Sequence, residues 1–396
     1  MKRMNSFCFW NIILVITCVF VLQSCGSRQS KKKIQTEEKL EVLQNKNELF
    51  IYNFYIENSG SVKGYFKGTA NNAEVIIKEF YDRIDEKLKP EEKITLNYIN
   101  NQIIPQKENI DEWLNGTYVN CNAAFSDLDV VLEQILQNTD SKTVNFVVSD
   151  YCFESRDGNL GKAQSGITNI FTKALDKNND LSIIIYKYEA AFDGYYFPGK
   201  IKFVGSRPLY IWIFGPNAAL KKISNLNIEQ ECENEIHIQS HRSFVAQVQT
   251  NNKRMTNNER SCIYIKHWRC NRNESDLYKV DIKVFMKDIM LPASAIQNID
   301  NYRITPAGYY VDNVQYIAND EYIFTIATRH PSPCTLNIYY KLDIPNWVEK
   351  SNYEGNILPK DSTTYGIKNL IGGVVNAYKN QNANIFDISL LIKYKK

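Results

Sequence analysis

Histidine is scarce in this chain, and the motifs of several large enzyme classes are missing. Only 4 of the 396 residues are histidine, and no C-x-x-C, H-E-x-x-H, G-x-S-x-G, G-x-G-x-x-G or Walker motif occurs. The missing C-x-x-C pairs argue against a structural zinc site. The other absences argue against the common metalloprotease, serine hydrolase, dinucleotide-binding and P-loop classes. The sequence therefore favours a binding protein over an enzyme.

An excess of charge of one sign is also missing. Lys and Arg number 47 against 44 Asp and Glu, which gives a formal net charge of +3. This balance gives no support for nucleic-acid binding.

The apolar run at 12–22 is shorter than the roughly 20 residues that a membrane-spanning helix needs. It follows Lys2 and Arg3, and this order is typical of a secretory signal peptide.

The signal segment ends in Leu22-Gln23-Ser24-Cys25, which resembles a bacterial lipobox. The resemblance implies that residues 1–25 form a lipoprotein signal peptide and lipobox and that Cys25 is acylated, so that the membrane is a partner through the lipid anchor. An uncleaved N-terminal anchor is the alternative. Residues 26–48 are polar and are expected to form a tether. We expect a lipid-anchored protein of the cell envelope that faces the periplasm, with the outer surface as the alternative, because no acidic run follows Cys25.

Strand and helix patterns alternate over residues 49–227. Apolar strands are expected at 50–56, 94–99, 144–149, 181–188 and 209–214, and amphipathic helices at 73–88, 126–137, 167–175 and 217–223. The run at 144–149 is largely apolar, which is typical of a central strand buried on both faces. This alternation predicts an α/β domain with a doubly wound, mostly parallel sheet flanked by helices.

Residues 228–396 follow a different pattern. Apolar and polar residues alternate around 278–284, 322–326 and 336–340, which predicts strands with one solvent-facing side. We therefore expect a second, β-rich and sandwich-like domain, with a lone helix at 364–378 and a last strand at 385–392.

The cysteines beyond the lipobox are even in number, which permits disulfides in an oxidising compartment. They are Cys121, Cys152, Cys232, Cys262, Cys270 and Cys334.

Oxygen-bearing side chains follow two of the expected strands. Glu57-Asn58-Ser59-Gly60-Ser61 comes directly after the first strand, and Asp150 follows the buried strand at 144–149. Ser126 begins an expected helix. The carboxyl ends of strands are where open α/β sheets bind their ligands. Carboxylate and hydroxyl oxygens suit Mg²⁺, with Mn²⁺ as the alternative.

This constellation resembles the metal-ion-dependent adhesion site of von Willebrand factor A domains, which begins with Asp-x-Ser-x-Ser. Glu57 stands where that family has Asp, and Ser126 stands where it has Thr. The resemblance covers roughly residues 49–225. It implies a von Willebrand A-like fold whose metal ligands are Glu57, Ser59, Ser61, Ser126 and Asp150. In that family an open coordination position accepts a carboxylate, which implies an envelope protein with an acidic contact residue as the partner.

The expected function is that of a membrane-anchored protein-binding or adhesion module. A metal-free structural scaffold of the envelope is the alternative, because Glu57 is one methylene longer than the Asp of the family and Mg²⁺ demands near-ideal geometry. A metal-dependent phosphoester hydrolase with Ser59 as nucleophile is a third hypothesis. No His or Lys beside either serine motif is a convincing base, and a base from a distant part of the sequence is the alternative. The chain is expected not to be an enzyme.

Two other segments carry candidate binding groups. Residues 192–196 and 206–210 form either an aromatic, arginine-bearing ligand loop or a β-hairpin whose rings pack on the sheet, and the pattern favours the hairpin. His237 and His241 lie four residues apart. Their apolar neighbours indicate a strand, on which two rings at this spacing are not expected to form a metal site.

Overall fold

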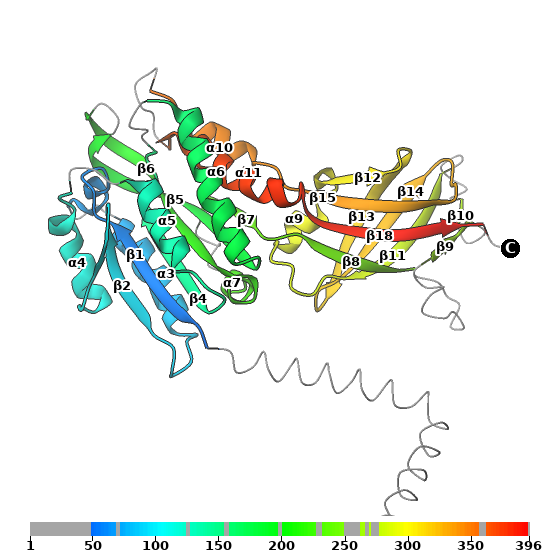
Figure 1. The fold of residues 1–396 in the computed structure, drawn as a ribbon, viewed down its shortest axis with the longest axis horizontal. Helices are drawn as coiled ribbons and strands as arrows, with labels where there is room; N and C mark the ends of the chain where they lie inside the picture. The colour runs from blue at the N-terminus through cyan, green and yellow to red at the C-terminus, as the bar shows by residue number, and fades with distance from the viewer. Residues whose placement is uncertain are drawn as a thin grey trace, which may run out of the picture. The chain divides into compact units, whose positions relative to one another are not determined.

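A seven-stranded sheet dominates the N-terminal half of the fold, with the strand order β3-β2-β1-β4-β6-β5-β7 (Figure 1). This computed structural model describes residues 49–68, 72–123, 127–153, 158–196, 200–226, 232–248, 262–265, 269–270, 277–355 and 362–394. The strands of this first sheet are β1 (Ile51–Glu57), β2 (Ile94–Ile99), β3 (Ile103–Pro105), β4 (Thr143–Ser149), β5 (Leu181–Tyr196), β6 (Ile201–Pro216) and β7 (Asn234–Ile238).

The pairing in this sheet is mixed. Strands β2, β1 and β4 are parallel, whereas β3, β6, β5 and β7 pair antiparallel with their neighbours. The sequence predicted parallel pairing through most of the sheet. Strand β6 departs from this pattern because it returns from β5 through a hairpin, and a hairpin joins antiparallel strands. The coarser prediction of an α/β fold is confirmed.

Helices cover both faces of the first sheet. Successive side chains of a strand point to opposite faces, so Phe54 and Tyr55 of β1 belong to two separate hydrophobic cores. Helices α3, α4 and α7 pack on the core that contains Phe54, and α5 and α6 on the core that contains Tyr55. Their bounds are α3 (Ala73–Asp85), α4 (Ile110–Asn120), α5 (Leu128–Gln137), α6 (Leu160–Lys177) and α7 (Asn217–Ser224).

The strand order reverses between β1 and β4. The chain passes from β1 to β2 on one side and later returns to place β4 on the other side. The carboxyl ends of β1 and β4 are therefore neighbours, and Glu57 and Asp150 lie at these two ends. Such a switch point is the usual ligand-binding place of an open α/β sheet.

Strands β5 and β6 form a long hairpin of 16 residues in each strand. The sequence predicted strands only over the first half of β5, at 181–188, and near the end of β6, at 209–214. It also favoured a hairpin over a ligand loop for residues 192–196 and 206–210, and the hairpin is confirmed. Because side chains alternate along a strand, the outer end of the hairpin presents a buried face with Phe192 and Tyr196 and an opposite face with Asp193 and Tyr195.

The second sheet has nine strands and contains most of the C-terminal half of the chain. Its main path is β12-β15-β18-β8-β11-β14-β13, with β10 beside β11 and β9 beside β18. Except for the parallel pairs of β18 with β8 and β9, its pairing is antiparallel. Its strands are β8 (Arg242–Val248), β9 (Cys262–Tyr264), β10 (Arg269–Cys270), β11 (Tyr278–Phe285), β12 (Tyr302–Thr305), β13 (Tyr309–Ala318), β14 (Glu321–Thr328), β15 (Cys334–Lys341) and β18 (Asn384–Lys393).

This second sheet curls on itself. Tyr302 lies on the end strand β12, yet its ring centroid is 5.6 Å from that of Phe324 on β14, near the opposite end of the strand order. The sandwich-like arrangement expected from the sequence is therefore replaced by one curled sheet. Short elements flank it, namely α9 (Ala293–Gln297), η4 (Ile299–Asn301) and α10 (Asn346–Ser351).

After β15 the chain returns to the first sheet. Helix α11 (Ile367–Gln381) lies beside α6 (Figure 1), and Thr168 Oγ1 donates a hydrogen bond to Gly373 O at 3.1 Å. A Cβ on Gly373 would lie 2.8 Å from Gln164 O, so this close approach requires glycine. The two-residue strands β16 (Asn352–Tyr353) and β17 (Thr364–Tyr365) precede α11. The domain boundary at 227/228 stays a prediction, because residues on both sides of it share one core.

The predicted signal peptide, the tether at 26–48 and the lipidation residue Cys25 lie outside the described residues. Within the described ranges of the chain, no helix has the length and apolar character needed to cross a membrane.

Candidate functional site

The structure brings three of the predicted site residues together. Ser59 and Ser61 lie on the loop after β1, and their hydroxyl oxygens are 2.9 Å apart. Ser61 Oγ donates to Asp150 Oδ1, on the segment after β4, at 3.5 Å. Ser126 lies outside the described residues. Parallel pairing of β1 with β4 explains the meeting of Ser59, Ser61 and Asp150 across about 90 residues of sequence.

Glu57 is directed to a different partner. Its side chain is only 3 % exposed and accepts a hydrogen bond from Ser149 Oγ, at the end of the neighbouring strand β4. Ser149 Oγ in turn accepts a hydrogen bond from the Tyr151 amide at 2.7 Å. The carboxylate of Glu57 therefore links the end of β1 to the end of β4.

Arg207 completes the site, and its role was not predicted. It lies on β6, and its Nη2 atom is 3.3 Å from Asp150 Oδ2. The side chains of Arg207 and Asp150 are 0 % and 1 % exposed. The Cys152 amide donates to the other carboxylate oxygen at 3.1 Å. Asp150 is therefore neutralised by a fixed guanidinium instead of facing solvent.

Aromatic rings enclose the guanidinium of Arg207. Its Cζ atom is 4.1 Å from the ring centroid of Tyr196, 4.6 Å from that of Phe192 and 5.7 Å from that of Tyr65. Among the residues that the structure describes, its Nε and Nη1 atoms have no hydrogen-bond partner. Desolvated cation–π contacts stabilise such a group by about 2 kcal/mol or more, so the rings partly offset the missing acceptors.

The arginine stays charged in this environment. Burial is the largest influence on Arg207 and by itself would lower its pKa, but Tyr65, Asp150 and Tyr196 together raise the pKa above the ordinary value of arginine. Burial also raises the pKa of Tyr65 and Tyr196, so both phenols are neutral at pH 7. Asp150 is therefore the anion that balances the charge of Arg207.

The aromatic rings can enclose Arg207 because the loop after β1 packs closely against the β5–β6 hairpin. The 3-10 helix η1 (Val62–Phe66) follows Ser61 and places Tyr65 with its ring centroid 4.9 Å from that of Phe192. A Cβ on Gly194 would lie 2.8 Å from the Gly64 Cα atom and 2.7 Å from Phe192 Cζ. Only glycine at 64 and 194 allows the two backbones to approach this closely.

The segment around β17, which precedes α11, also packs over this edge of the first sheet. Tyr196 OH donates to Thr363 O at 3.0 Å, and the Ser362 amide donates to Ser206 O at 3.1 Å. The Phe153 amide donates to Tyr365 O at 2.9 Å. The C-terminal half of the chain thus helps to close the place where an open site was expected.

The residues at this site do not fit a Mg²⁺ or Mn²⁺ ion in this arrangement. Mg²⁺ needs near-octahedral oxygen ligands at about 2.0–2.1 Å, but Asp150 is paired with Arg207 and Glu57 accepts from Ser149. A dication bound to Asp150 would also meet the positive charge of Arg207. Among the described residues, no group of three or more His, Cys, Asp or Glu side chains gathers around a common point. The metal prediction remains to be decided by titration.

Ser59 is 3 % exposed, and its hydroxyl is hydrogen-bonded to the hydroxyl of Ser61, which donates to Asp150 Oδ1. The expectation that the chain is not an enzyme stays a prediction.

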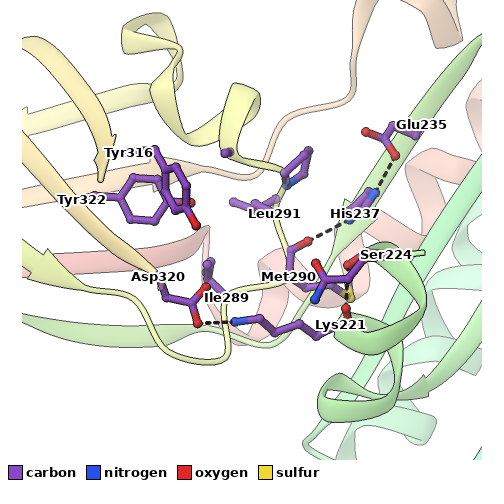
Figure 2. A pocket seen from close by; sticks show the side chains of 13 residues that line it. Lys221, Ser224, Glu235, His237, Ile289, Met290, Leu291, Tyr316, Asp320 and Tyr322 are labelled. Atoms are coloured by element: carbon purple, nitrogen blue, oxygen red, sulfur yellow. Dashed lines mark hydrogen bonds and ion pairs between the residues drawn. The ribbon is translucent and has the colours of Figure 1, made fainter. Parts of the chain in front are cut away.

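His237 belongs to a second polar cluster, at a cavity of about 250 Å³ (Figure 2). Its Nδ1 atom is 3.0 Å from Met290 O and its Nε2 atom is 2.8 Å from Glu235 Oε2. Across the cavity, Lys221 Nζ lies 2.8 Å from Asp320 Oδ2. The hydrogen bond of His237 with Met290 and the ion pair of Lys221 with Asp320 thus connect β7 and α7 to the segments that border the second sheet.

The two histidines do not form a pair. His241 Nε2 lies 2.7 Å from Asp387 Oδ1 on β18, away from the partners of His237. The expectation that they do not share a metal stays a prediction. Cys121, Cys262 and Cys334 carry free thiols in the structure.

One signal in the sequence pointed to Arg207. It is the only charged residue between Lys202 and Lys221, and it leads directly into the apolar run at 208–214. A charge carried into a buried strand must be paired. Its partner could not be named from the sequence, because Asp150 is 57 residues away and meets it only through the pairing of β4 with β6.

Comparison of the chain with protein-family models, with curated proteins and with solved structures returned no match in any of the three.

Proposed function

We propose that this chain is a metal-independent protein-binding module of the cell envelope, with a von Willebrand A-like arrangement in its N-terminal half and a lipid anchor at Cys25. One observation carries the metal independence: the guanidinium of Arg207 lies 3.3 Å from Asp150, at the carboxyl edge of the sheet, and is fully buried. It supplies at this position the positive charge that a metal ion supplies in the adhesion site.

The charge balance supports this proposal. An adhesion site of the metal type keeps an exposed cation with an open position for a partner's carboxylate. Here the cation is covalently attached, caged by rings and already paired, so it holds the edge of the sheet in one arrangement. Recognition then falls to the exposed residues around that edge. Adhesion through a metal ion stays the competing hypothesis, since Ser59, Ser61 and Asp150 lie within hydrogen-bonding reach of one another.

Photo-crosslinking in the native cell tests the proposal. A photoreactive phenylalanine analogue replaces Val119, which is 69 % exposed beside the site, or Val245, which is 70 % exposed on β8. We expect a discrete crosslinked protein from position 119, equally abundant with and without EDTA, and none from the control position 245. Loss of the product in EDTA and its return with Mg²⁺ would support the metal-dependent alternative instead. Absence of any discrete product from position 119 would overturn the protein-binding proposal.

The anchor is tested separately. In Cys25→Ala the acylation site is lost, so we expect the protein to leave the membrane fraction. An unchanged membrane fraction would favour the uncleaved N-terminal anchor.

A further inference from the structure

We infer that the exposed face of the β5–β6 hairpin, together with the neighbouring residues of η1 and α4, is a docking surface for an acidic segment of a partner protein. This inference rests on the proposed function and names the chemistry of its partner. The Lys–Tyr surface, as we call it, consists of Lys63, Lys67, Tyr118, Val119, Asp193, Tyr195, Lys200, Lys202 and Val204.

The Lys–Tyr surface is exposed to solvent and contains several large side chains with apolar area. Tyr195 is 47 % exposed and Val204 is 69 % exposed, on adjacent strands of the hairpin. Tyr118 and Val119, at the end of α4, are 38 % and 69 % exposed. Exposed tyrosine is enriched at protein interfaces because it offers apolar area and a polar group at a low entropic cost.

Lysines surround these rings. Lys200 and Lys202 each have Nζ 5.7 Å from the ring centroid of Tyr195, and Lys63 Nζ is 4.7 Å from that of Tyr118. Cation–π contacts at exposed sites contribute about 0.5–1 kcal/mol each. The three ammonium groups therefore lie next to tyrosine rings and stay accessible to a partner.

A single carboxylate joins the two halves of the surface. Lys67 Nζ lies 2.7 Å from Asp193 Oδ2, and Lys202 pairs with the other oxygen of Asp193. Lys67 also lies near enough to Tyr118 to interact with it electrostatically. Two of the four lysines thus pair with one aspartate, and the surface has an excess of positive charge.

This composition favours an acidic protein segment over an anionic bilayer. Lysine is depleted at most protein interfaces, so a group of lysines around two tyrosines predicts a partner of opposite charge. A bilayer needs only summed positive charge. Discrete ammonium positions next to aromatic rings instead match carboxylates that alternate with apolar side chains.

Fluorescence anisotropy with the full-length protein in detergent tests the inference, with a labelled oligoglutamate peptide as the probe. We expect saturable binding that weakens as salt is added. The double variant Lys200→Glu/Lys202→Glu should weaken it at least about tenfold, because two attractive charges become repulsive. The matched control is Lys87→Glu/Lys142→Glu, two exposed lysines at the opposite end of the first sheet, which should bind as the wild type does.

Two further arms separate the alternatives. Lys200→Gln/Lys202→Gln removes the charges without inverting them and should give an intermediate loss. Vesicles of phosphatidylcholine and phosphatidylglycerol test the lipid alternative: binding to them that depends on Lys200 and Lys202 and exceeds that to the peptide would overturn the inference. Equal peptide binding by the hairpin and control variants would also overturn it.

Crosslinking and peptide binding together separate a failure of the docking surface from a failure of the proposed function. If the crosslinked protein persists in Lys200→Glu/Lys202→Glu while peptide binding is unchanged, the chain binds a protein beside Val119 without these lysines, and the inference of an acidic partner segment fails. If the crosslink is absent from the native cell while peptide binding depends on the two lysines, the surface recognises acidic chains and the proposed function fails.

Discussion

The two faces of the β5–β6 hairpin place charged residues in opposite environments. On the inner face, Arg207 meets Asp150 where both are almost completely buried; on the outer face, Lys202 meets Asp193 where 48 % and 37 % of the side chains remain exposed. Alternation along one strand decides this outcome, since residues 202 and 207 differ by an odd number and point to opposite sides.

The two environments give the charged residues different roles. Buried charges stabilise the fold, whereas exposed charges can bind a partner. Removing one partner of a buried pair leaves an uncompensated charge in the interior, which is costly. An exposed pair is hydrated and screened, so it contributes little to stability. We conclude that Arg207 maintains the edge of the sheet, whereas the lysines on the outer face are available to a partner.

The largest effect is expected from Arg207→Met. This variant leaves Asp150 buried without its cation, which should cost about 3–5 kcal/mol of unfolding free energy. Urea denaturation followed by circular dichroism measures it. The double variant Asp150→Asn/Arg207→Met should lose less than the sum of the two single variants, because neither then leaves an unpaired charge. Additive losses would show that Arg207 and Asp150 do not act as a pair.

A smaller loss is expected where the hairpin meets η1. The new Cβ of Gly194→Ala would lie 2.8 Å from Gly64 Cα, so the backbones must separate, at a cost of roughly 1–3 kcal/mol. The control is Gly166→Ala in α6, where a Cβ meets nothing within 4 Å; it should be neutral or stabilising by up to about 1 kcal/mol. Equal urea midpoints for the two variants would contradict the tight contact.

The outer face should show the reverse balance of effects. Lys202→Gln should leave the urea midpoint unchanged, because its ion pair is exposed, and it should weaken binding of the oligoglutamate peptide. A clear fall in the midpoint without any change in peptide binding would assign Lys202 a structural role and remove the contrast between the two faces.

The smallest effect concerns the titration of Asp193. Hydrogen bonds from Lys202 and Lys67 lower the pKa of this carboxyl group. Since its pKa is lower in the folded than in the unfolded protein, its contribution to stability is present above the unfolded pKa and is lost as the pH falls through the folded pKa. Carboxyl NMR should show the Asp193 midpoint rising in Lys67→Gln and Lys202→Gln. An unmoved midpoint would mean that these lysines do not hold Asp193 in solution.

Much of the first sheet could be predicted because its signals are local. The apolar run at 144–149 predicted β4, and the polar run after β1 predicted the loop that carries Ser59 and Ser61, which meets Asp150 as expected. Local signals could not supply the direction of β6. Antiparallel pairing of β4 with β6 is a tertiary feature, and it brings Arg207 to Asp150.

The sequence favoured a hairpin at 192–196 and 206–210, but the continuity of β5 past residue 188 was missed for a related reason. Residues 189–196 contain Glu189, Asp193 and Gly194, which interrupt the apolar pattern of a buried strand. In the structure these interruptions have a role, because Gly194 permits the approach of Gly64 and Asp193 faces outward to its lysines. Alternation of Ala190, Phe192 and Tyr196 was the available signal for a strand that continues past 188.

Calorimetric titration of Mn²⁺ and Mg²⁺ into the full-length protein tests the central claim most directly, with Asp150→Asn as control. If Arg207 supplies the positive charge of this site, the wild-type protein will show no saturable binding that Asp150→Asn removes. Saturable one-site binding by the wild type that is lost in Asp150→Asn would contradict the account and restore a metal-dependent adhesion site.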